Sequence, residues 1–580
     1  MGLNTASRIA LRTLIGLLTV ALVGCAPAAP PSPTAAPAGG QAKPTEAAQA
    51  APAAQPTSAP AAAPAQQAAP AQAGGAAQAG GQKTIVIGMT HDFKTFDPDR
   101  VYETFGGMAV YAIYEPLLQF EGEDLTKPKP LIASEWQADP SGKLYTFTLR
   151  DGVKFASGNP LTSADVKFSF DRLKNIKGQG SFLADNITGV EAPDPKTVKV
   201  TLKNVDPAFL GMMGRAQYAI VDSKLAKEHG ATSEPGSDQS DKAEGWFLMN
   251  SAGSGPYVLK EYVPKDRLVL DRNPSYWGKA PPVDRVILKN IEDPATQKLT
   301  LEKGDIDIAF DLTTDQIKAL DTSKGVKAYN ARSLTQLFAY FNMDPQIGGP
   351  VSNLDVQRAI RSAIDYDGLV ELIGGGAIKL PSIIQLGFLG ALGPDAAPKT
   401  DLDKAKQFLA KGGYPNGFKI TLEVGSTEKT GGVAHLTLAQ KLQADLSKIG
   451  VNIEISTLDN NLALDKYRNG QTPMGSRGWN PDYPDALNQL AFGPGEKVGL
   501  RVNWKAEADP ELSQLVKQAQ VELDETKRAE MLKQIQLLIM DRGPYANLLQ
   551  PGRQIGLRHN IEGVLYNPVY HQSFVTLDKK

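Results

Sequence analysis

Cysteine is almost absent from this sequence, since one residue, Cys25, stands in a chain of 580. A single thiol excludes disulfide bonds within the chain, so the fold must depend on its hydrophobic core. Histidine is scarce too: the five residues are scattered without the spacing of metal ligands, and we expect neither a metal site nor a cofactor. No G-x-S-x-G or H-E-x-x-H pattern occurs, which removes two common sequence signs of a hydrolase.

An excess of charge of one sign is also missing. The chain has 61 Lys and Arg against 63 Asp and Glu, which gives a net charge of −2 at pH 7. Proteins that bind nucleic acid usually carry a basic surplus, so nucleic acid is not an expected partner. The composition, 42% hydrophobic and 21% charged, is typical of a globular protein with a large core.

Long hydrophobic runs are lacking, and the apolar run from Leu14 to Val23 is too short to span a bilayer comfortably. With Arg8 and Arg12 before it, this run is typical of a secretory signal. Its last letters, LVGC, resemble a bacterial lipobox, which implies that residues 1–24 are removed and that Cys25 is lipidated. The protein would then be anchored outside the cytoplasm, on the outer face of the cell membrane (the periplasmic side if a second membrane exists). A signal peptide with an incidental cysteine is the alternative.

Residues 25–83 consist almost entirely of Ala, Pro, Gln and Gly after the cysteine. Such a segment has too little apolar bulk to offset the entropy lost on ordering, so we predict a disordered tether. As a flexible coil it would span roughly 40 Å. The folded body is therefore expected to stay near a membrane without being fixed in orientation.

From Thr84 onward the sequence alternates between strand and helix patterns. In residues 145–149 (YTFTL) large apolar side chains recur at every second position, which predicts a strand with one buried face. Residues 418–424 and 451–455 are also typical of strands, and residues 438–449 between them carry apolar side chains at helical spacing. A strand, a helix and a strand in this order predict a parallel α/β unit.

Several segments of the body follow, in order, the motifs of one protein family. They are Thr95–Pro98 (TFDP), Tyr114–Leu118 (YEPLL), Leu131–Trp136 (LIASEW), Tyr145–Asp171, Gly253–Tyr257 (GSGPY), Arg272–Trp277 (RNPSYW), Gly304–Asp307 and Asp355–Ile360. Together they resemble the extracytoplasmic solute-binding proteins of family 5, the substrate-binding lipoproteins of peptide and nickel ABC importers (cluster C). Each motif alone is weak, but their shared order over most of the body argues against chance. We expect Thr162 and Asp355 to cap helices.

The resemblance implies an α/β fold of the two-lobed periplasmic-binding-protein type (type II), with an extra α+β domain inserted in lobe I. Lobe I would comprise residues 84–117, 246–337 and 545–580, the inserted domain residues 118–245, and lobe III residues 338–544. The hinge would consist of two crossing segments, around Ala339–Met343 and Gly543–Leu549. The lobes would close over a ligand by a hinge motion.

A function follows from the same resemblance. The protein would be a monomeric receptor without enzymatic activity, which captures di- or oligopeptides between its lobes. It would deliver them to the permease subunits of an ABC importer in the membrane. The motifs do not decide the length of the peptide.

The stretch RGWNPDYPDALNQL holds most of the candidate ligand contacts. Gly478, Trp479 and Asp482 keep the spacing of a GWxxDxxxP-like loop that lines the crevice in peptide-binding members, and Asn480 lies within this loop. The resemblance implies that Asp482 pairs with the α-ammonium group of the peptide, for which a shielded carboxylate is a strong partner. The alternative is that Asp482 serves a turn or a cap, as we expect of Asp485.

Two further residues, Tyr102 and Thr104, are candidates for contacts to the peptide main chain from lobe I. For the cation that some relatives place against the carboxylate of a dipeptide, no clear match exists in the sequence. Arg477 lies near the expected position without matching it.

Other functions stay open at this point. The same receptor role for an oligosaccharide or a nickel chelate is one alternative, because Trp479 could stack on a sugar. An extracellular hydrolase is the rival from another class, with Asp482 and Asp485 as acid and base. A purely structural or chaperone-like lipoprotein is the third.

Overall fold

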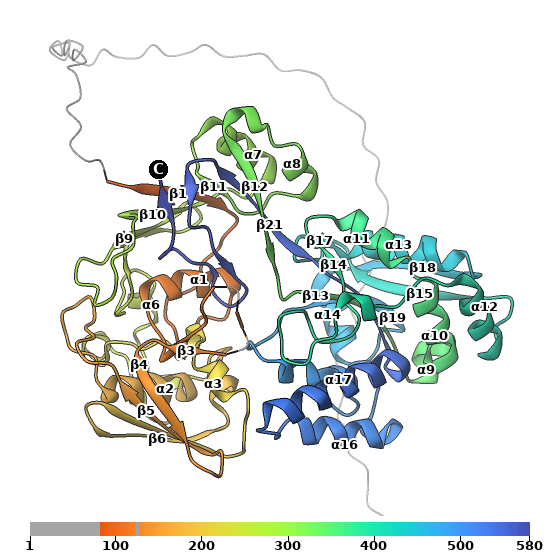
Figure 1. Cartoon of the computed structure of the whole chain (residues 1–580), viewed down its shortest axis with the longest axis horizontal. Coiled ribbons are helices and arrows are strands. Elements are labelled where there is room, and N and C mark those ends of the chain that lie inside the picture. The colour runs from red at the N-terminus through yellow and green to blue at the C-terminus, as the bar shows by residue number, and fades with distance from the viewer. Residues whose placement is uncertain (1–81, 123, 126) are drawn as a thin grey trace, which may run out of the picture. The chain divides into compact units, whose positions relative to one another are not determined.

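The structure is a computed structural model that describes residues 82–122, 124–125 and 127–580 (Figure 1). The predicted signal peptide, the lipidation candidate Cys25 and the tether up to residue 81 lie outside the described residues, as does the side chain of Thr104. Within the described residues, no helix combines the length and the apolarity needed to cross a membrane.

Lobe I is built on a seven-stranded sheet with the strand order β12-β21-β11-β1-β10-β9-β8. β1 pairs in parallel with β10 and β11, and the outer strands on both sides continue the sheet in antiparallel fashion. The strands are β1 (Thr84–Met89), β8 (Tyr257–Val263), β9 (Arg267–Arg272), β10 (Arg285–Asn290), β11 (Ile308–Ala309), β12 (Val326–Arg332) and β21 (Gly552–Arg558).

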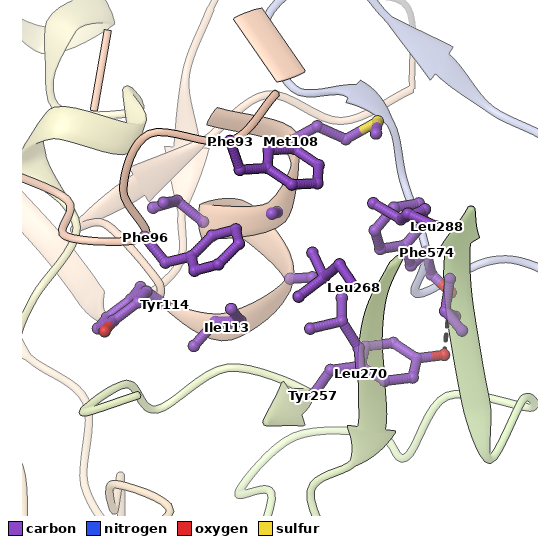
Figure 2. Close-up of a cluster of buried hydrophobic side chains, with 14 of the residues drawn as sticks. Phe93, Phe96, Met108, Ile113, Tyr114, Tyr257, Leu268, Leu270, Leu288 and Phe574 are labelled. Carbon is purple, nitrogen blue, oxygen red and sulfur yellow. Dashed lines mark hydrogen bonds between the residues drawn. The ribbon is translucent and has the colours of Figure 1, made fainter. Parts of the chain in front are cut away.

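The main core of lobe I lies between this sheet and helix α1 (Thr104–Ile113), as Figure 2 shows. Leu268 and Leu270 occupy alternate positions of β9 and therefore point to the same face of the sheet, toward Met108 of the helix. The helix carries no charged residue, so most of its surface can be buried. A smaller apolar cluster includes residues of α7 (Pro294–Lys303) and α8 (Thr314–Lys318).

The inserted domain has its own four-stranded antiparallel sheet, in the order β4-β5-β7-β6. Its elements are β4 (Ala133–Ala138), β5 (Leu144–Leu149), β6 (Ile187–Asp194), β7 (Thr197–Leu202), α2 (Ser163–Asn175), α3 (Phe209–Met212), α4 (Ser223–Glu228), α5 (Ser237–Ser240) and α6 (Glu244–Phe247). The side chains of β5 alternate between buried and half-buried, which confirms the predicted strand. Thr162 begins α2 in a capping box with Asp165, as predicted for Thr162.

Lobe III is built on a six-stranded sheet in the order β14-β20-β13-β19-β15-β18. The strands are β13 (Gln336–Phe341), β14 (Ile378–Lys379), β15 (Phe418–Gly425), β18 (Val451–Leu458), β19 (Met474–Trp479) and β20 (Tyr545–Gln550). β15 and β18 pair in parallel, with Phe418 opposite Val451, and α13 (His435–Ser447) connects them. The predicted α/β unit is therefore confirmed.

The remaining helices of lobe III surround its sheet (Figure 1). They are α9 (Pro345–Gly348), α10 (Leu354–Ala363), α11 (Tyr366–Ile373), α12 (Leu402–Lys411), α14 (Asn460–Arg468), α15 (Lys497–Leu500), α16 (Pro510–Ala519) and α17 (Glu525–Arg542). The prediction that Asp355 caps α10 is wrong, because the cap is Asn353, whose side chain accepts from the backbone N–H of Asp355. Asp355 lies in the first turn and pairs with Arg358 instead.

Eight short strands complete the described secondary structure in four pairs. They are β2 (Leu118–Gln119) with β3 (Lys129–Pro130), β16 (Lys429–Thr430) with β17 (Val433–Ala434), β22 (Ile561–Glu562) with β25 (Asp578–Lys579), and β23 (Tyr566–Asn567) with β24 (His571–Gln572). The last two pairs belong to the C-terminal segment, whose buried residues pack into the core of lobe I.

The chain passes between the two large sheets at positions that differ from the predicted hinge. β12 lies in the sheet of lobe I and β13 in that of lobe III, so the first crossing is at residues 333–335. The second crossing is at Pro551, between β20 and β21. The predicted hinge segments 339–343 and 543–549 largely coincide with β13 and β20, in which every residue is buried. The last segment of lobe I was predicted to begin at residue 545, and this is wrong because β20 belongs to the sheet of lobe III. The other domain boundaries stay predictions.

Candidate functional site

A cavity of about 430 Å³ lies where lobe I, the inserted domain and lobe III meet. Its walls come from the segment that leads into α1, from residues 215–217 of the inserted domain, and from the loop of residues 480–484 that follows β19. The first crossing borders it through residues 333–335, and residues 552–553, which begin β21 directly after the second crossing, border it too. A ligand in this cavity would therefore contact both lobes and the segments on which their relative motion depends.

Asp482 and Tyr102 meet across this cavity from different lobes. The hydroxyl of Tyr102 donates to Oδ1 of Asp482 at 2.8 Å. Burial and the neighbouring Asp482 carboxylate raise the pKa of Tyr102 above its ordinary value, so the hydroxyl keeps its proton and remains a donor. The backbone N–H of Asp482 donates to Oδ1 of Asn488 at 3.1 Å, which holds the loop in place. The structure thus brings together two of the residues predicted from the sequence.

Asn480 also lines the cavity. Thr104 does not, but its neighbours in the sequence, Glu103 and Phe105, do. Oδ1 of Asn480 accepts from the hydroxyl of Thr335 at 2.7 Å, so the loop is tied to the first crossing. Thr104 is the first residue of α1, and its side chain lies outside the described part of the structure.

Gly478 and Trp479 are not among the residues that line the cavity. Trp479 donates from Nε1 to Oδ1 of Asn488 at 3.1 Å, the same oxygen that accepts from the Asp482 backbone. Its ring packs edge-on against Phe492, with ring centroids 5.6 Å apart. A Cβ at position 478 would come within 2.0 Å of the Thr430 side chain, so glycine is required there for packing. Ligand contact by these two residues stays a prediction, and the contacts in the structure give them a role in positioning the loop.

Asp485 has the structural role that was predicted for it. Its side chain accepts from the backbone N–H of Leu487 and caps the 3₁₀-helix Ala486–Phe492. Burial raises the pKa of Asp485 above its ordinary value. Asp482 lines the cavity, whereas Asp485 does not and is engaged as a helix cap.

Arg215 is a residue of the cavity that the sequence interpretation missed. Its Nε donates to Oε1 of Gln217 at 3.1 Å, and within the described residues it forms no ion pair. Nε2 of Gln217 donates to the backbone carbonyl of Val101 at 2.8 Å, so Gln217 ties Arg215 to the segment that carries Tyr102. A sequence sign did exist: Arg215 is the only charged residue between Phe209 and Val221.

Arg477, the cation considered from the sequence, is not available to a ligand. It is 5% exposed, and its Nη1 donates to both carboxylate oxygens of Glu428. Its guanidinium also lies over the ring of Tyr467, at 5.5 Å from the centroid. This pairing is internal to lobe III, and Arg477 does not line the cavity.

Two more basic residues, Arg553 and His571, border the cavity. Arg553 is paired with neighbouring groups of the protein, and His571 is uncharged. Arg553 donates to the carbonyl of Phe310 at 2.7 Å and to Asp311 at 2.9 Å. Burial, together with the nearby positive charges of Arg553 and Arg215, lowers the pKa of His571 to about 3. His571 is therefore neutral near pH 7, and Arg215 is the cation left for an anionic group of a ligand.

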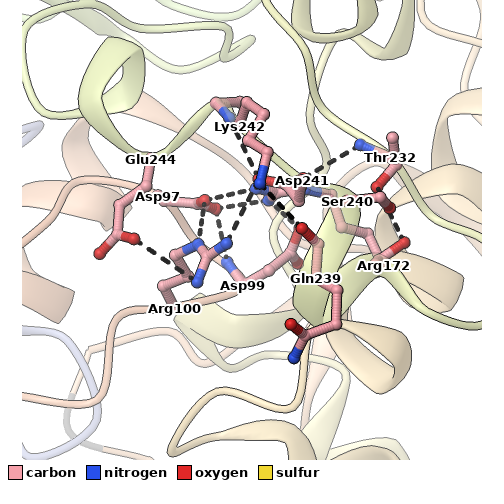
Figure 3. A network of polar contacts seen from close by, with 12 residues as sticks. Asp97, Asp99, Arg100, Arg172, Thr232, Gln239, Ser240, Asp241, Lys242 and Glu244 are labelled. Atoms are coloured by element: carbon pink, nitrogen blue, oxygen red, sulfur yellow. Dashed lines mark hydrogen bonds and ion pairs between the residues drawn. The ribbon is translucent and has the colours of Figure 1, made fainter.

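A buried ionic cluster supports the segment that leads to Tyr102 (Figure 3). Arg172 of α2 is fully buried and donates to Asp97 and Asp99 at 2.6 Å and to Asp241 at 2.9 Å. Arg100 adds a second cation beside Asp241 at 3.3 Å. The cluster joins the TFDP motif of lobe I to the inserted domain and so fixes the direction in which the chain approaches the cavity.

The donor set of the described residues does not suit a metal ion. No group of three or more His, Cys, Asp or Glu side chains in the part of the chain that the structure describes is arranged to hold one. The three carboxylates of the buried cluster surround the Arg172 guanidinium instead.

Comparison with known proteins gives this arrangement a family. The model of the bacterial extracellular solute-binding proteins, family 5 (middle part), matches residues 127–496. The probable D,D-dipeptide-binding periplasmic protein DdpA of Escherichia coli is 30% identical over 511 residues, which cover 84% of this chain and 93% of that protein. The chain belongs to family 5 of the bacterial extracellular solute-binding proteins.

Other relatives of this solute-binding family match over similar lengths. The dipeptide-binding protein DppE of Bacillus subtilis is 24% identical, over 86% of this chain and 92% of that protein. The solved structure of the periplasmic binding protein DppA from Helicobacter pylori, in complex with the peptide STSA, covers 86% of this chain and 98% of its own at a TM-score of 0.66 and 24% identity. This likeness confirms the two-lobed type II fold expected from the motifs.

Proposed function

We propose that this protein captures short peptides between lobe I and lobe III and delivers them to the permease of an ABC importer. The observation that carries the proposal is the pair of opposite charges, Asp482 and Arg215, that border one cavity. A free peptide is a zwitterion, so one charge can meet its ammonium group and the other its carboxylate. The names of the Escherichia coli and Bacillus subtilis relatives, both dipeptide-binding proteins, support peptides as the solute class.

Asp482 is the proposed partner of the peptide ammonium group. One of its oxygens accepts from Tyr102, which leaves the second for an ammonium donor. Away from bulk water such a charge-assisted hydrogen bond is strong, and an ammonium group left there without a partner would be costly. The loop is held by Asn488 and Thr335, so the carboxylate is pre-positioned before the ligand arrives.

The size and place of the cavity support a small ligand that is enclosed by both lobes. A volume of about 430 Å³ falls in the range of small-molecule sites and favours a short peptide over a long one. A peptide that touches Asp482 in lobe III and Arg215 in the inserted domain would stabilise the closed arrangement of the lobes, and the permease would recognise that arrangement. We further propose that lipidated Cys25 anchors the monomeric receptor to the outer face of the membrane, and that the peptide leaves unaltered.

Calorimetry with matched dipeptides and tripeptides tests this function. We expect free peptides to bind, and N-acetylated peptides to bind at least about 30-fold more weakly, because acetylation removes the charge that Asp482 meets. The variant Asp482→Asn keeps an oxygen for Tyr102 but loses the negative charge, so it should lower the affinity of the free peptide by a similar factor and leave that of the acetylated peptide unchanged.

Asp465→Asn, which removes an exposed carboxylate of lobe III, is the matched control and should bind like the unmodified protein. Equal affinity for free and acetylated peptides would remove Asp482 from its proposed role. If only oligosaccharides or nickel chelates bind, or if mass spectrometry finds the peptide cleaved after incubation, the peptide-receptor function itself is wrong.

A further inference from the structure

A second cavity, of about 310 Å³, lies between lobe I, its C-terminal segment and the first residues of the inserted domain, and no residue of lobe III lines it. One side is formed by α1, with Met108 and Ala112, and the other by residues 565–576. Phe120 and Phe574 add aromatic walls, and Figure 2 shows Met108 and Phe574 in the adjoining core. Apolar side chains of this kind bind the apolar body of a small molecule.

Gln572 lines this cavity and carries a buried hydrogen-bond acceptor that is not used. Its side chain is 2% exposed, and its Nε2 donates to the carbonyl of Ser573 at 2.7 Å. Its Oε1 is buried and has no hydrogen-bond partner within the described residues. Buried polar atoms in folded proteins nearly always have a partner, so an acceptor left open beside a cavity points to a donor supplied by a ligand.

Two other polar side chains of this cavity, Glu115 and Tyr570, are weaker candidates for binding a ligand. Glu115 accepts from Tyr276 at 2.8 Å, from Trp277 at 2.7 Å and from Ser254 at 2.8 Å, so its two oxygens already have three donors. These donors come from the GSGPY and RNPSYW motifs, which gives Glu115 a structural role. The hydroxyl of Tyr570 lies near the Phe120 backbone but forms no hydrogen bond there.

The two cavities share Tyr111 as a dividing wall. Its hydroxyl donates to the carbonyl of Gly214 at 2.9 Å, and the ring of Tyr570 packs edge-on against it with centroids 5.0 Å apart. No residue of lobe III lines the second cavity. A molecule bound there would therefore contact lobe I without depending on closure of the lobes.

We propose that the second cavity is a binding site for a small uncharged molecule with an aromatic or branched apolar body and one N–H or O–H group, which donates to Oε1 of Gln572. The apolar walls select the body, and the open acceptor selects the donor. The site does not rest on the peptide-receptor function, because none of its wall residues carries the charges that read a peptide.

Indole and benzothiophene form a matched pair of probes, since they have nearly the same shape and differ in the N–H group. With the whole body of the protein, we expect indole to bind saturably and benzothiophene about tenfold more weakly. A saturating dipeptide, or the Asp482→Asn variant, should leave both affinities unchanged. Gln572→Met should bring the two probes to equal affinity, because methionine keeps the length of the side chain but offers no comparable acceptor.

Ala112→Leu provides a second variant, since its larger side chain would fill the cavity and abolish binding of both probes. A crystal soaked with indole gives a readout that needs no variant, with density expected beside Gln572. The proposal is overturned if indole does not bind saturably, if benzothiophene binds equally well to the unmodified protein, or if the dipeptide displaces indole, which would place the probe in the first cavity. Loss of peptide binding alone would contradict the proposed receptor function and leave this inference standing.

Discussion

Two arginines of the inserted domain show how differently one residue type can be used. Arg172 is fully buried and has three carboxylate partners, all within 3 Å. Arg215 borders the cavity between the lobes and forms no ion pair within the described residues. A charge whose partners are all internal stabilises one arrangement of the chain. A charge that no opposite charge meets, beside a cavity, is available to a ligand, so we expect the two arginines to serve different purposes.

Removal of Arg172 should have the largest effect, and it should be on stability. Arg172→Met would leave Asp97, Asp99 and Asp241 buried without their main cation, which we expect to lower the free energy of unfolding by about 3–5 kcal/mol. Urea unfolding followed by circular dichroism measures this loss. Lys224→Met, an exposed substitution in the same domain, should change stability by less than about 0.5 kcal/mol. An Arg172→Met protein as stable as the control would show that the cluster is not structural.

Removal of Arg215 should have a smaller effect, and it should be on affinity. Arg215→Gln is expected to weaken binding of a peptide with a free carboxylate about 30-fold, because a charge-assisted pair across the cavity is lost, with little change in unfolding. A C-terminally amidated peptide should bind the variant and the unmodified protein alike. Calorimetry with both peptides measures the difference, and an equal loss for both would make Arg215 a structural residue like Arg172.

The smallest effect concerns the proton balance of the buried cluster. Burial raises the pKa of Asp99 to about 8, and its Oδ1 accepts no hydrogen bond. The folded protein therefore holds this proton more tightly than the unfolded chain, whose pKa is near 4, so the stability that it contributes is lost as pH rises from about 4 through 8. Asp99→Asn removes this loss, and its stability relative to the unmodified protein should rise by about 1.3 kcal/mol between pH 5 and pH 6, because one pH unit between the two pKa values corresponds to about 1.4 kcal/mol.

Chemical denaturation of both proteins at the two pH values measures this change. If the difference in unfolding free energy between the two proteins stays constant with pH, Asp99 is ionised in the folded protein at both pH values, and the prediction is wrong. In that case the three carboxylates of the cluster would outnumber the two cations, Arg172 and Arg100, that face them.

The elements that the sequence predicts well are those with a local cause. The unit from Phe418 to Leu458 follows from apolar periodicity, and Asp485 caps a helix because the acceptor lies next to the N–H groups that it serves. The hinge was misplaced because it depends on which sheet a strand joins. That choice is made by pairing with strands distant in sequence, such as β13 with β19 and β20.

The candidate site could be predicted only in part for the same reason. The loop resemblance led to Asp482, and the structure adds its hydrogen bond to Tyr102. The role proposed for Arg215 depends on the absence of an ion pair within the described residues, and a sequence does not state which charges are paired in space. Arg477, nearer in sequence to the loop, is taken by Glu428, a pairing between β19 and the turn after β15 that no spacing rule predicts.

The two crossings lie side by side and are hydrogen-bonded to each other. The hydroxyl of Ser333 donates to the carbonyl of Pro551, and Nε2 of Gln550 donates to the carbonyl of Ser333 at 2.6 Å. A single strand between two bodies permits torsion about its own length, whereas two bonded strands resist torsion and bend most easily in one direction. The two lobes of this receptor are therefore expected to move mainly by one bending motion about the crossings. The surface that faces a membrane partner would then form in the same way each time the lobes close.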